Sequence, residues 1–314
     1  ELKNEDVTSI AFMAREGFYL KKLFDLYQKL LIPTKELIET SYYWCSRRSV
    51  MSGIKSELMP DAINGKITLK NWLKSLNLSI EDVAAYVQIE EEEENELSDL
   101  RNNSIYNSLI ENVEFSTLFD RLVEKNNSAF RAYTQKYIHN GYFRFVDSGW
   151  KCTTQNVIER CYGIKTEGYY IGVQIPDIQI GELKRKGLIF SEIEPKSKYY
   201  DYLGMNIPFY QQLLAAPHGT ALKYVQDDNE VRVIYEWDPM EKKLYDERIK
   251  ELQKYMLLKF RGMCAWNDSA AYDKKNDWII AKQSMKSSLF AYGTRLNFVR
   301  ECTENYVQNF RQEN

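Results

Sequence analysis

The chain lacks the residues on which several common kinds of site depend. Its 314 residues include only two histidines, His139 and His218, too few for a histidine-rich metal site and little material for a histidine-based triad. The five cysteines are scattered and form no Cys-x-x-Cys pair, which argues against a zinc site or disulfide framework and fits a reducing cytoplasm. No apolar run approaches the ~20 residues of a membrane span.

The sequence also lacks an excess of basic residues. It has 42 Lys and Arg against 45 Asp and Glu, a net charge of −3, so nothing points to nucleic acid as a partner. A hydrophobic fraction of 44% and a charged fraction of 28% are typical of a globular protein with ample core. Tyrosine is abundant, with 23 residues, and aromatic surfaces suit both half-buried packing and sugars.

The stretch 141–163 has the pattern of a strand, a polar turn and a helix. A β-favouring run at 143–146 stops at Asp147, Ser148 and Gly149, and Thr153 and Thr154 then open a segment with helical apolar spacing. A helix N-terminus offers free N–H groups and suits a phosphate, whereas the carboxylate could bind sugar hydroxyls or a metal ion. The alternative is an ordinary turn with Thr153 as the helix N-cap.

A second unit of the same kind opens the chain. Residues 10–13 predict a buried strand, Arg15, Glu16 and Gly17 a turn, and residues 20–31 an amphipathic helix. Arg15 can neutralise a pyrophosphate, and Glu16 can hold a metal ion or take a proton. The alternative is a surface Arg–Glu pair of little energetic weight. Turns at the carboxyl ends of parallel strands face one crevice. We therefore expect the turns that contain Arg15 and Asp147 to lie at the same crevice.

A third polar turn follows a strand expected at 41–45. It contains Ser46, Arg47 and Arg48, and two adjacent arginines could meet a pyrophosphate or a glycan phosphate. The alternative is a solvated basic turn.

Four motifs in order resemble one family. They are AREG at 14–17, YYWCSRRS at 42–49, FVDSGWKCTTQ at 145–155 and FYQQLLAAPHGTALKY at 209–224. Together they are similar to the phosphoribosyltransferases that assemble ribofuranose-containing bacterial O-antigens and capsules, a domain often fused to a haloacid-dehalogenase-type phosphatase. The chain departs from the family pattern where Glu16 replaces Asp and where Lys151-Cys152 replaces an aromatic or polar residue followed by Gly.

The resemblance implies a donor, 5-phosphoribosyl 1-pyrophosphate (PRPP), with Mg²⁺, and an acceptor that is a lipid-linked or growing glycan. It implies Glu16 and Asp147 as the catalytic carboxylates and as metal ligands. The PRPP-binding residues would be Arg15, Gly17, Arg47, Arg48, Ser148, Gly149, Thr153, Thr154 and Gln155. Glu194 and His218 would contact acceptor or donor.

We expect an α/β, Rossmann-like fold with a mostly parallel sheet. Residues 1–52 and 141–238 would form the PRPP-binding core, 53–140 a helical insertion that caps the crevice, and 239–314 a helical region that only packs on the core. Within these parts we expect strands at 168–173 and 187–193, a hairpin at 222–225 and 231–235, and helices at 245–260, 278–290 and 294–310. The chain enters its first strand within ten residues, and we expect it to be part of a longer polypeptide.

The expected function is transfer of 5-phosphoribosyl to a glycan hydroxyl, in the cytoplasm or at the inner face of the membrane. The chain lacks the DxDxT/V nucleophile motif of the dehalogenase-type phosphatases, so a partner in cis or trans would remove the 5-phosphate. Two alternatives stay open. One is a non-catalytic glycan-binding or scaffold domain beside a phosphatase. The other is a nucleotide-sugar glycosyltransferase, although no DxD motif follows a strand.

Overall fold

The structure is a computed structural model that describes Leu2 and residues 7–58, 67–88, 97–98, 103–175, 182–194, 211–227 and 230–267. The helices expected at 278–290 and 294–310 lie outside the described residues, as do the first residues of the motif at 209–224 and the hairpin turn at 228–229. Within the described ranges, no helix is long and apolar enough to cross a bilayer.

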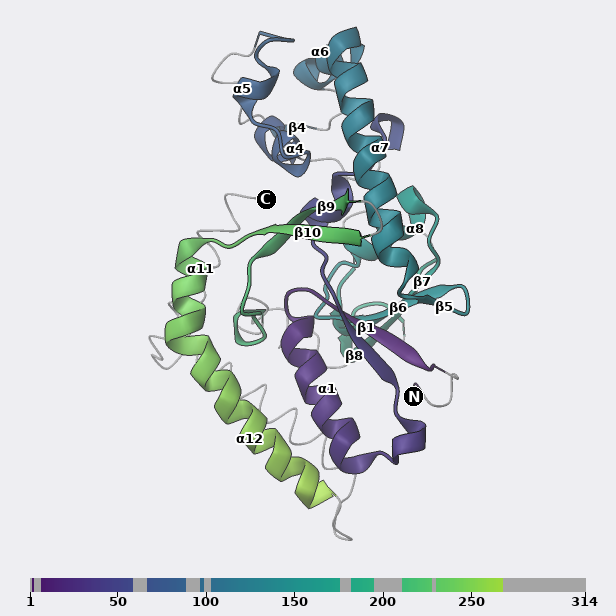
Figure 1. Ribbon diagram of the computed structural model, residues 1–314, viewed down its shortest axis with the longest axis vertical. Helices are drawn as coiled ribbons and strands as arrows, with labels where there is room; N and C mark the ends of the chain where they lie inside the picture. Colours follow the sequence, from purple (N-terminus) through teal and green to yellow (C-terminus); the bar gives the residue numbers. More distant parts are fainter. Residues whose placement is uncertain are drawn as a thin grey trace.

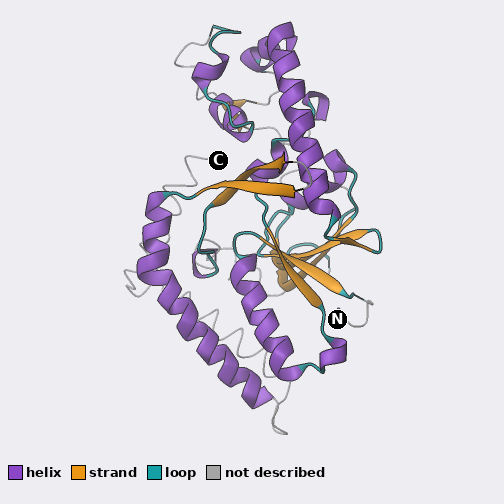
Figure 2. Cartoon of the chain, viewed as in Figure 1, coloured by secondary structure: helices purple, strands orange, loops and turns teal. Residues whose placement is uncertain are grey.

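The predicted mostly parallel α/β sheet is confirmed (Figures 1 and 2). Five parallel strands lie in the order β2-β1-β6-β7-β8, and a two-residue strand, β5, pairs antiparallel with β6. Their bounds are β1 Ser9–Met13, β2 Glu39–Tyr43, β5 Ile138–His139, β6 Tyr142–Asp147, β7 Thr166–Val173 and β8 Lys184–Ser191.

The strand order reverses between β1 and β6. The chain passes from β1 outward to β2 and then returns past β1 to form β6 on its other side. In an open α/β sheet, such a reversal leaves a crevice at the carboxyl ends of the two strands, where ligands usually bind. The turns that contain Arg15 and Asp147 follow these two strands.

Helices cover both faces of the sheet because side chains alternate along β1. Ile10 and Phe12 face the side of α1 (Gly17–Leu31), against which α12 (Lys250–Asn267) also packs. Ala11 and Met13 face the larger core, which α7 (Val113–Gln135) and α8 (Thr153–Tyr162) help to build. The result is a three-layer sandwich in which α1 and α8 begin at the same edge of the sheet.

The region expected as an insertion is a small helical subdomain with a long helix leading back to the core (Figure 1). Two short helices precede it in the chain, η2 Thr34–Glu36 and α2 Arg47–Met51. Its own elements are η3 Ser56–Leu58, β3 Ile67–Thr68, α4 Leu69–Ser75, α5 Ile80–Val83, β4 Leu97–Ser98, α6 Ser104–Glu111 and α7. Ser79 and Asp82 form a capping box at the start of α5.

Helix α7 belongs to the core as much as to the insertion. Asn112 ends α6 and caps α7 by accepting hydrogen bonds from two backbone N–H groups. At the other end of α7, the ring of Phe130 lies 4.2 Å from that of Tyr162, and Tyr133 lies 5.1 Å from Tyr43. Helix α7 is therefore the crossover helix between β2 and β6, and residue 140 is not a boundary between separately packed parts.

The C-terminal half begins with the predicted hairpin. Strands β9 (Thr220–Asp227) and β10 (Glu230–Glu236) pair antiparallel, with a bulge near Tyr235. The chain then forms α11 (Pro239–Leu244), one π-helical turn (Tyr245–Ile249) and α12, where a single helix was expected. The first turn of α11 is capped by Asp238, whose carboxylate accepts from Met240 N and Glu241 N.

Candidate active site

The turns after β1 and β6 lie at the same edge of the sheet, as the sequence predicts. Phe12 pairs with Val146 in register, so Arg15 and Glu16 follow one strand where Asp147 ends its neighbour. Each turn also contains a cis peptide bond, Ala14–Arg15 in the first and Gly149–Trp150 in the second.

The first turn places a cation and a carboxylate at the start of α1. Glu16 is the N-cap residue of α1, and its carboxylate accepts a hydrogen bond from Arg15 N at 3.2 Å. Gly17 packs against the backbone of β1, because a Cβ there would lie 2.7 Å from the carbonyl carbon of Phe12. Gly17 thus permits close strand–helix packing, and the functional side chains of this turn are Arg15 and Glu16.

The guanidinium of Arg15 is already paired. It donates to the carboxylate of Glu241 in α11, in an ion pair whose side chains are only 20% and 16% exposed. A buried cation needs such a partner, because an uncompensated charge away from water is costly. The region after residue 239, expected to contribute packing alone, therefore supplies a charged residue to the site.

The second turn is fixed to the end of β7. The carbonyl of Ser148 accepts from Gly172 N at 3.2 Å, and that of Trp150 accepts from Gln174 N at 2.8 Å. Gly149 has φ +133°, and a Cβ there would lie 2.3 Å from the carbonyl oxygen of Gly172. No side chain fits at this position, so the glycine is a requirement of the turn.

Cys152 takes a backbone conformation that glycine adopts more readily than cysteine does. Its φ of 56° and ψ of 24° are left-handed, which costs a non-glycine residue roughly 1–2 kcal/mol. Cys152 is also the N-cap residue of α8, and its side chain makes no capping bond. Thr153 is accordingly the first residue of the helix, and the alternative in which it serves as the N-cap is wrong.

The start of α8 leaves hydroxyls available for a ligand. Neither the Thr153 nor the Thr154 hydroxyl has a hydrogen-bond partner within the described part of the chain, and both side chains are half-buried. Free backbone N–H groups and the positive end of the helix dipole favour an anion at such a place. The feature agrees with the predicted phosphate-binding loop.

Asp147 is the most perturbed carboxyl group of the site. Protein surrounds it closely, although some of its surface still meets solvent, and this burial raises its pKa to about 8, with a further contribution from the negative charge of Glu16. Hydrogen bonds from the backbone N–H groups of Ser148 and Gly149 oppose the shift. Two carboxylates that repel one another at the crevice favour either a proton or a cation between them.

His218 stands beside the first turn as a neutral imidazole. Its Nδ1 lies 2.9 Å from the carbonyl oxygen of Gly219, which can only accept, so Nδ1 carries the proton. Nε2 is then the acceptor of the Tyr42 hydroxyl at 2.7 Å. Burial lowers the pKa of His218, and the charge of Arg15 lowers it further. His218 is therefore uncharged at neutral pH and cannot add positive charge to the site.

A small cavity of about 60 Å³ lies against the first turn. Arg15, Glu16, His218 and Glu241 line it, together with Gln211, Gln212, Ala215, Ala216, Trp237, Tyr245 and Ile249. This volume holds a few water molecules. The described part of the insertion contributes no lining residue, and besides the first turn the lining comes from residues 211–218 and 237–249.

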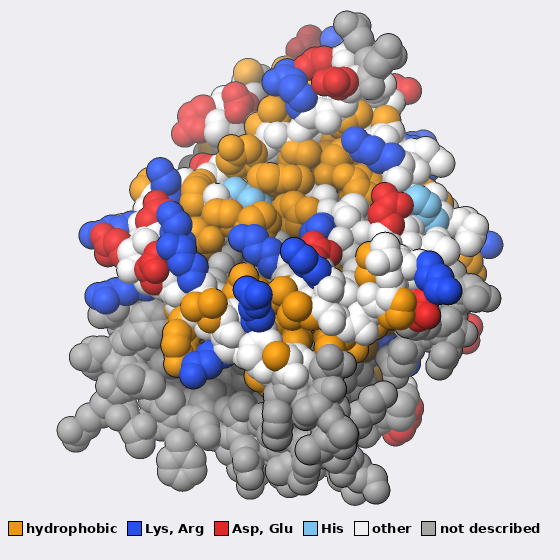
Figure 3. All heavy atoms as spheres, turned by 60° about the horizontal axis from the view of Figure 1, so that its bottom comes forward, with side chains coloured by type: hydrophobic (Ala, Val, Ile, Leu, Met, Phe, Trp, Pro, Cys, Tyr) orange, Lys and Arg blue, Asp and Glu red, His pale blue; other side chains and the backbone are white. Residues whose placement is uncertain are grey.

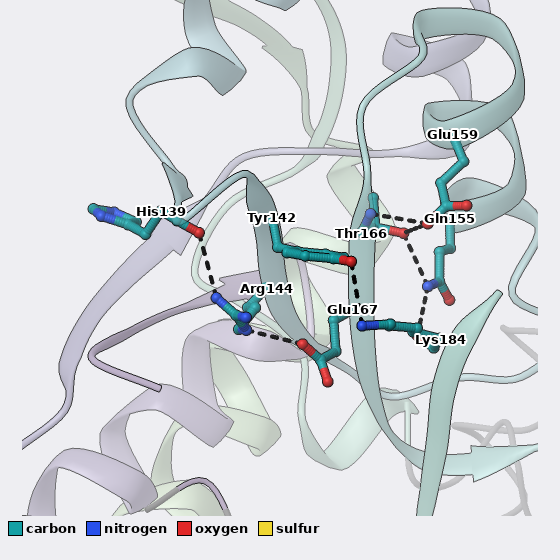
Figure 4. A network of polar contacts seen from close by, with 8 residues as sticks. All are labelled: His139, Tyr142, Arg144, Gln155, Glu159, Thr166, Glu167 and Lys184. Atoms are coloured by element: carbon teal, nitrogen blue, oxygen red, sulfur yellow. Dashed lines mark hydrogen bonds and ion pairs between the residues drawn. The ribbon is translucent and has the colours of Figure 1, made fainter. Parts of the chain in front are cut away.

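Gln155 does not face the turn. Its side chain is fully buried, donates to Thr166 Oγ1 and to the Lys184 carbonyl, both at 2.9 Å, and accepts from the Tyr170 hydroxyl at 2.9 Å. Figure 4 shows it within a network that joins α8, β7 and β8. Because these bonds use the polar atoms of the Gln155 side chain, we assign this side chain a structural role and not the predicted contact with PRPP.

The structure also places Arg47, Arg48 and Glu194 away from the cavity. Arg48 turns toward the insertion, where it donates to the Lys74 carbonyl and to Asn77, and it pairs with Glu236 at 3.3 Å. Arg47 is exposed in the first turn of α2, and Glu194 is exposed beyond β8. The expectation that an arginine of this pair faces the crevice is not met by Arg48.

The sequence analysis missed three residues of the site. Tyr42 and Trp44 lie beside His218, and Glu241 pairs with Arg15. The expected strand 41–45 ends instead at Tyr43, because Trp44 N donates to the hydroxyl of Tyr133 at 3.1 Å. The aromatic run after the strand was the available signal for Tyr42 and Trp44. Glu241 carries no local signal, since it is one of several charged residues on an amphipathic helix.

Among the described residues, no group of three or more His, Cys, Asp or Glu side chains is arranged to hold a metal ion. Mg²⁺ does not need one, since it commonly binds to one or two carboxylates and completes its shell with water and substrate phosphate. The mutually repelling Glu16 and Asp147 fit that donor set. The nearby thiols of Cys45 and Cys152 remain protonated, because burial raises their pKa to about 12 and 11.

No known protein-family model matches the chain, and no curated protein matches it.

Proposed function

We propose that the chain transfers a 5-phosphoribosyl group from PRPP to a hydroxyl of a lipid-linked or growing bacterial polysaccharide. The observation that carries the proposal is the meeting of two turns at the point of strand reversal. One supplies Arg15 and Glu16, and the other supplies Asp147 and the start of α8. A phosphorylated ribose with a pyrophosphate needs that combination of cation, carboxylate and phosphate-binding N–H groups.

The reaction breaks the bond between ribose C1 and the pyrophosphate oxygen, and forms a bond from C1 to the acceptor oxygen. Negative charge grows on the departing pyrophosphate, and positive charge grows on the ribose ring. Arg15 would stabilise the leaving group, with each hydrogen bond to a charged group worth about 1.5–3 kcal/mol. Glu16 and Asp147 would hold Mg²⁺, which would supply further neutralisation of the charge on the leaving group.

The second turn would hold the ribose. Thr153, Thr154 and the N–H groups of α8 would bind the 5-phosphate, and Asp147 would orient the ribose hydroxyls. The acceptor proton passes to a carboxylate, either Glu16 or Asp147. Burial raises the pKa of Asp147 to about 8, which makes its carboxylate a stronger base than an ordinary aspartate.

The product would keep its 5-phosphate. The sequence has no aspartyl nucleophile in a phosphatase motif, so a haloacid-dehalogenase-type phosphatase in cis or in trans would remove it. An acceptor on a lipid carrier would place the reaction at the inner face of the membrane.

One observation favours a second candidate, a non-catalytic glycan-binding domain. The cavity of about 60 Å³ is too small for PRPP. In addition, Glu241 forms an ion pair with Arg15, the residue that would bind the pyrophosphate. Under our proposal, the donor displaces Glu241 from Arg15. Under the second candidate, the ion pair is permanent.

Calorimetry with PRPP and Mg²⁺, against a panel of nucleotide sugars, separates these functions. We expect PRPP to bind to the wild type and binding to be lost in Arg15→Ala, whereas Arg131→Ala, which removes an arginine from an exposed position of α7, should bind as the wild type does. Mass spectrometry of a synthetic acceptor should then show one added phosphoribosyl unit. Binding of a nucleotide sugar but not PRPP, or of neither, would overturn the proposal.

A further inference from the structure

The rings beside the Arg15 turn form a continuous surface. The ring of Trp44 lies 3.8 Å from His218 at 31°, and 5.2 Å from Tyr235 at 36°. His218 lines the cavity at Arg15 and Glu16. The surface formed by Trp44 and Tyr235, which we term the aromatic ledge, therefore leads outward from the reacting turn.

The ledge is rigid. The backbone of Trp44 is held on both sides by buried tyrosines, since its N–H donates to the Tyr133 hydroxyl at 3.1 Å and its carbonyl accepts from the Tyr224 hydroxyl at 2.7 Å. His218 behind the indole is fixed by its bonds to Gly219 and Tyr42. A preorganised surface of this kind loses little conformational entropy when a ligand binds.

Tyr235 is unusually exposed for its place in the hairpin. It follows Val231 and Val233 on the face of β10 that packs against the core, yet 53% of its surface is exposed. The indole Nε1 of Trp44 is not among the fully buried polar atoms and makes no hydrogen bond to the described residues. The ledge thus offers an aromatic face with a free donor at its edge. Figure 3 shows hydrophobic side chains gathered on one side of the molecule beside lysines and arginines.

We infer that the aromatic ledge binds a neutral sugar ring of the acceptor glycan. A sugar has one apolar C–H face and a polar rim, which match a flat aromatic surface with a hydrogen-bond donor beside it. The inference rests on the proposed function, because it assigns the ledge to the acceptor of that reaction. A ring stacked on Trp44 and Tyr235 would present its neighbour to the turn of Arg15 and Glu16.

The experiment uses methyl glycosides, which carry no aromatic group of their own. Saturation-transfer NMR measures contact between the full chain and methyl glycosides of glucose, galactose, mannose, N-acetylglucosamine, rhamnose and ribofuranose. We compare Tyr235→Ala and Tyr235→Phe with Tyr255→Ala, which removes a similarly exposed ring from α12. At least one glycoside should show transfer, which falls at least five-fold in Tyr235→Ala and persists in the other two variants.

The outcomes also separate this inference from the proposed function. PRPP binding is measured on the same samples by calorimetry, and it should be unchanged in Tyr235→Ala. Absence of PRPP binding to the wild type defeats the proposed function whatever the glycosides do. If PRPP binds, the absence of transfer to every glycoside overturns the inference about the aromatic ledge but not the proposed function. Transfer that persists in Tyr235→Ala has the same meaning. Transfer to uridine or adenosine monophosphate in place of the glycosides makes the ledge a nucleobase site and also overturns it.

Discussion

Replacement of Asp147 by Asn should change how the stability of the protein depends on pH. The pKa of Asp147 is raised from 3.8 to about 8 by burial and by the charge of Glu16. Between about pH 4 and pH 8, the unfolded chain has therefore lost a proton that the folded chain keeps. The folded state binds more protons in this range, so the free energy of unfolding falls as the pH rises.

The magnitude follows from the separation of the two pKa values. At ~1.4 kcal/mol per pH unit, the separation of the two pKa values corresponds to a loss of about 5–6 kcal/mol in the free energy of unfolding once Asp147 is fully ionised. Residual solvent contact and coupling to Glu16 reduce this figure, and we expect about 2–4 kcal/mol between pH 5 and pH 9. Asn has nearly the same shape, can still accept from Ser148 N and does not titrate.

Urea unfolding at pH 5, 7 and 9, without metal, measures the effect. The difference in unfolding free energy between Asp147→Asn and the wild type should grow in favour of the variant as the pH rises. Titrating groups that do not interact with Asp147 are shared by both proteins and cancel in the difference. Asp120→Asn, at an exposed position of α7, should show no such trend. A difference for Asp147→Asn that stays constant from pH 5 to pH 9 would refute the reasoning.

Three further predictions concern the same site. Thr153→Val combined with Thr154→Val should weaken PRPP binding by about 1.5–3 kcal/mol for each lost bond to phosphate, and equal calorimetric affinity in a folded double variant would contradict the phosphate-binding loop. Glu241→Gln should tighten PRPP binding several-fold, because it removes the anion that competes for Arg15; unchanged or weaker binding would count against that competition. Tyr42→Phe should raise the pKa of His218 in an NMR titration, because the Tyr42 hydroxyl donates to Nε2 and favours the neutral ring, and an unchanged value would mean that this bond contributes nothing.

The parts of the fold that the sequence could predict are those that depend on neighbours along the chain. The strand–turn–helix units at Arg15 and Asp147 follow from β-favouring runs, turn residues and helical spacing, all within about twenty residues. Even there the details differ, because Cys152 takes a left-handed conformation that its residue type does not favour. The local sequence also does not determine the direction of a side chain. Gln155, for example, directs its side chain to β7, where it donates to Thr166 Oγ1.

The parts that the sequence could not predict depend on contacts between distant segments. Glu241 pairs with Arg15 across 226 positions, and Tyr42 meets His218 across 176. Nothing in the local pattern of α11 distinguishes Glu241 from its charged neighbours, since its role is set by where the hairpin directs the following helix. The cap expected at 53–140 stays a prediction, and the sequence did not reveal that α7, its last helix, is also the crossover helix of the sheet.

Under the proposed function, the Arg15–Glu241 pair would give helix α11 a direct influence on donor binding. A guanidinium that is only 20% exposed must have an anionic partner, and α11 supplies one. A pyrophosphate at Arg15 would replace that partner and leave the Glu241 carboxylate, only 16% exposed, without its cation. The Glu241 side chain would then have to turn toward water. Under the proposed function, donor affinity would therefore depend on the difference between two ion pairs, and it would be coupled to the position of Glu241 in α11.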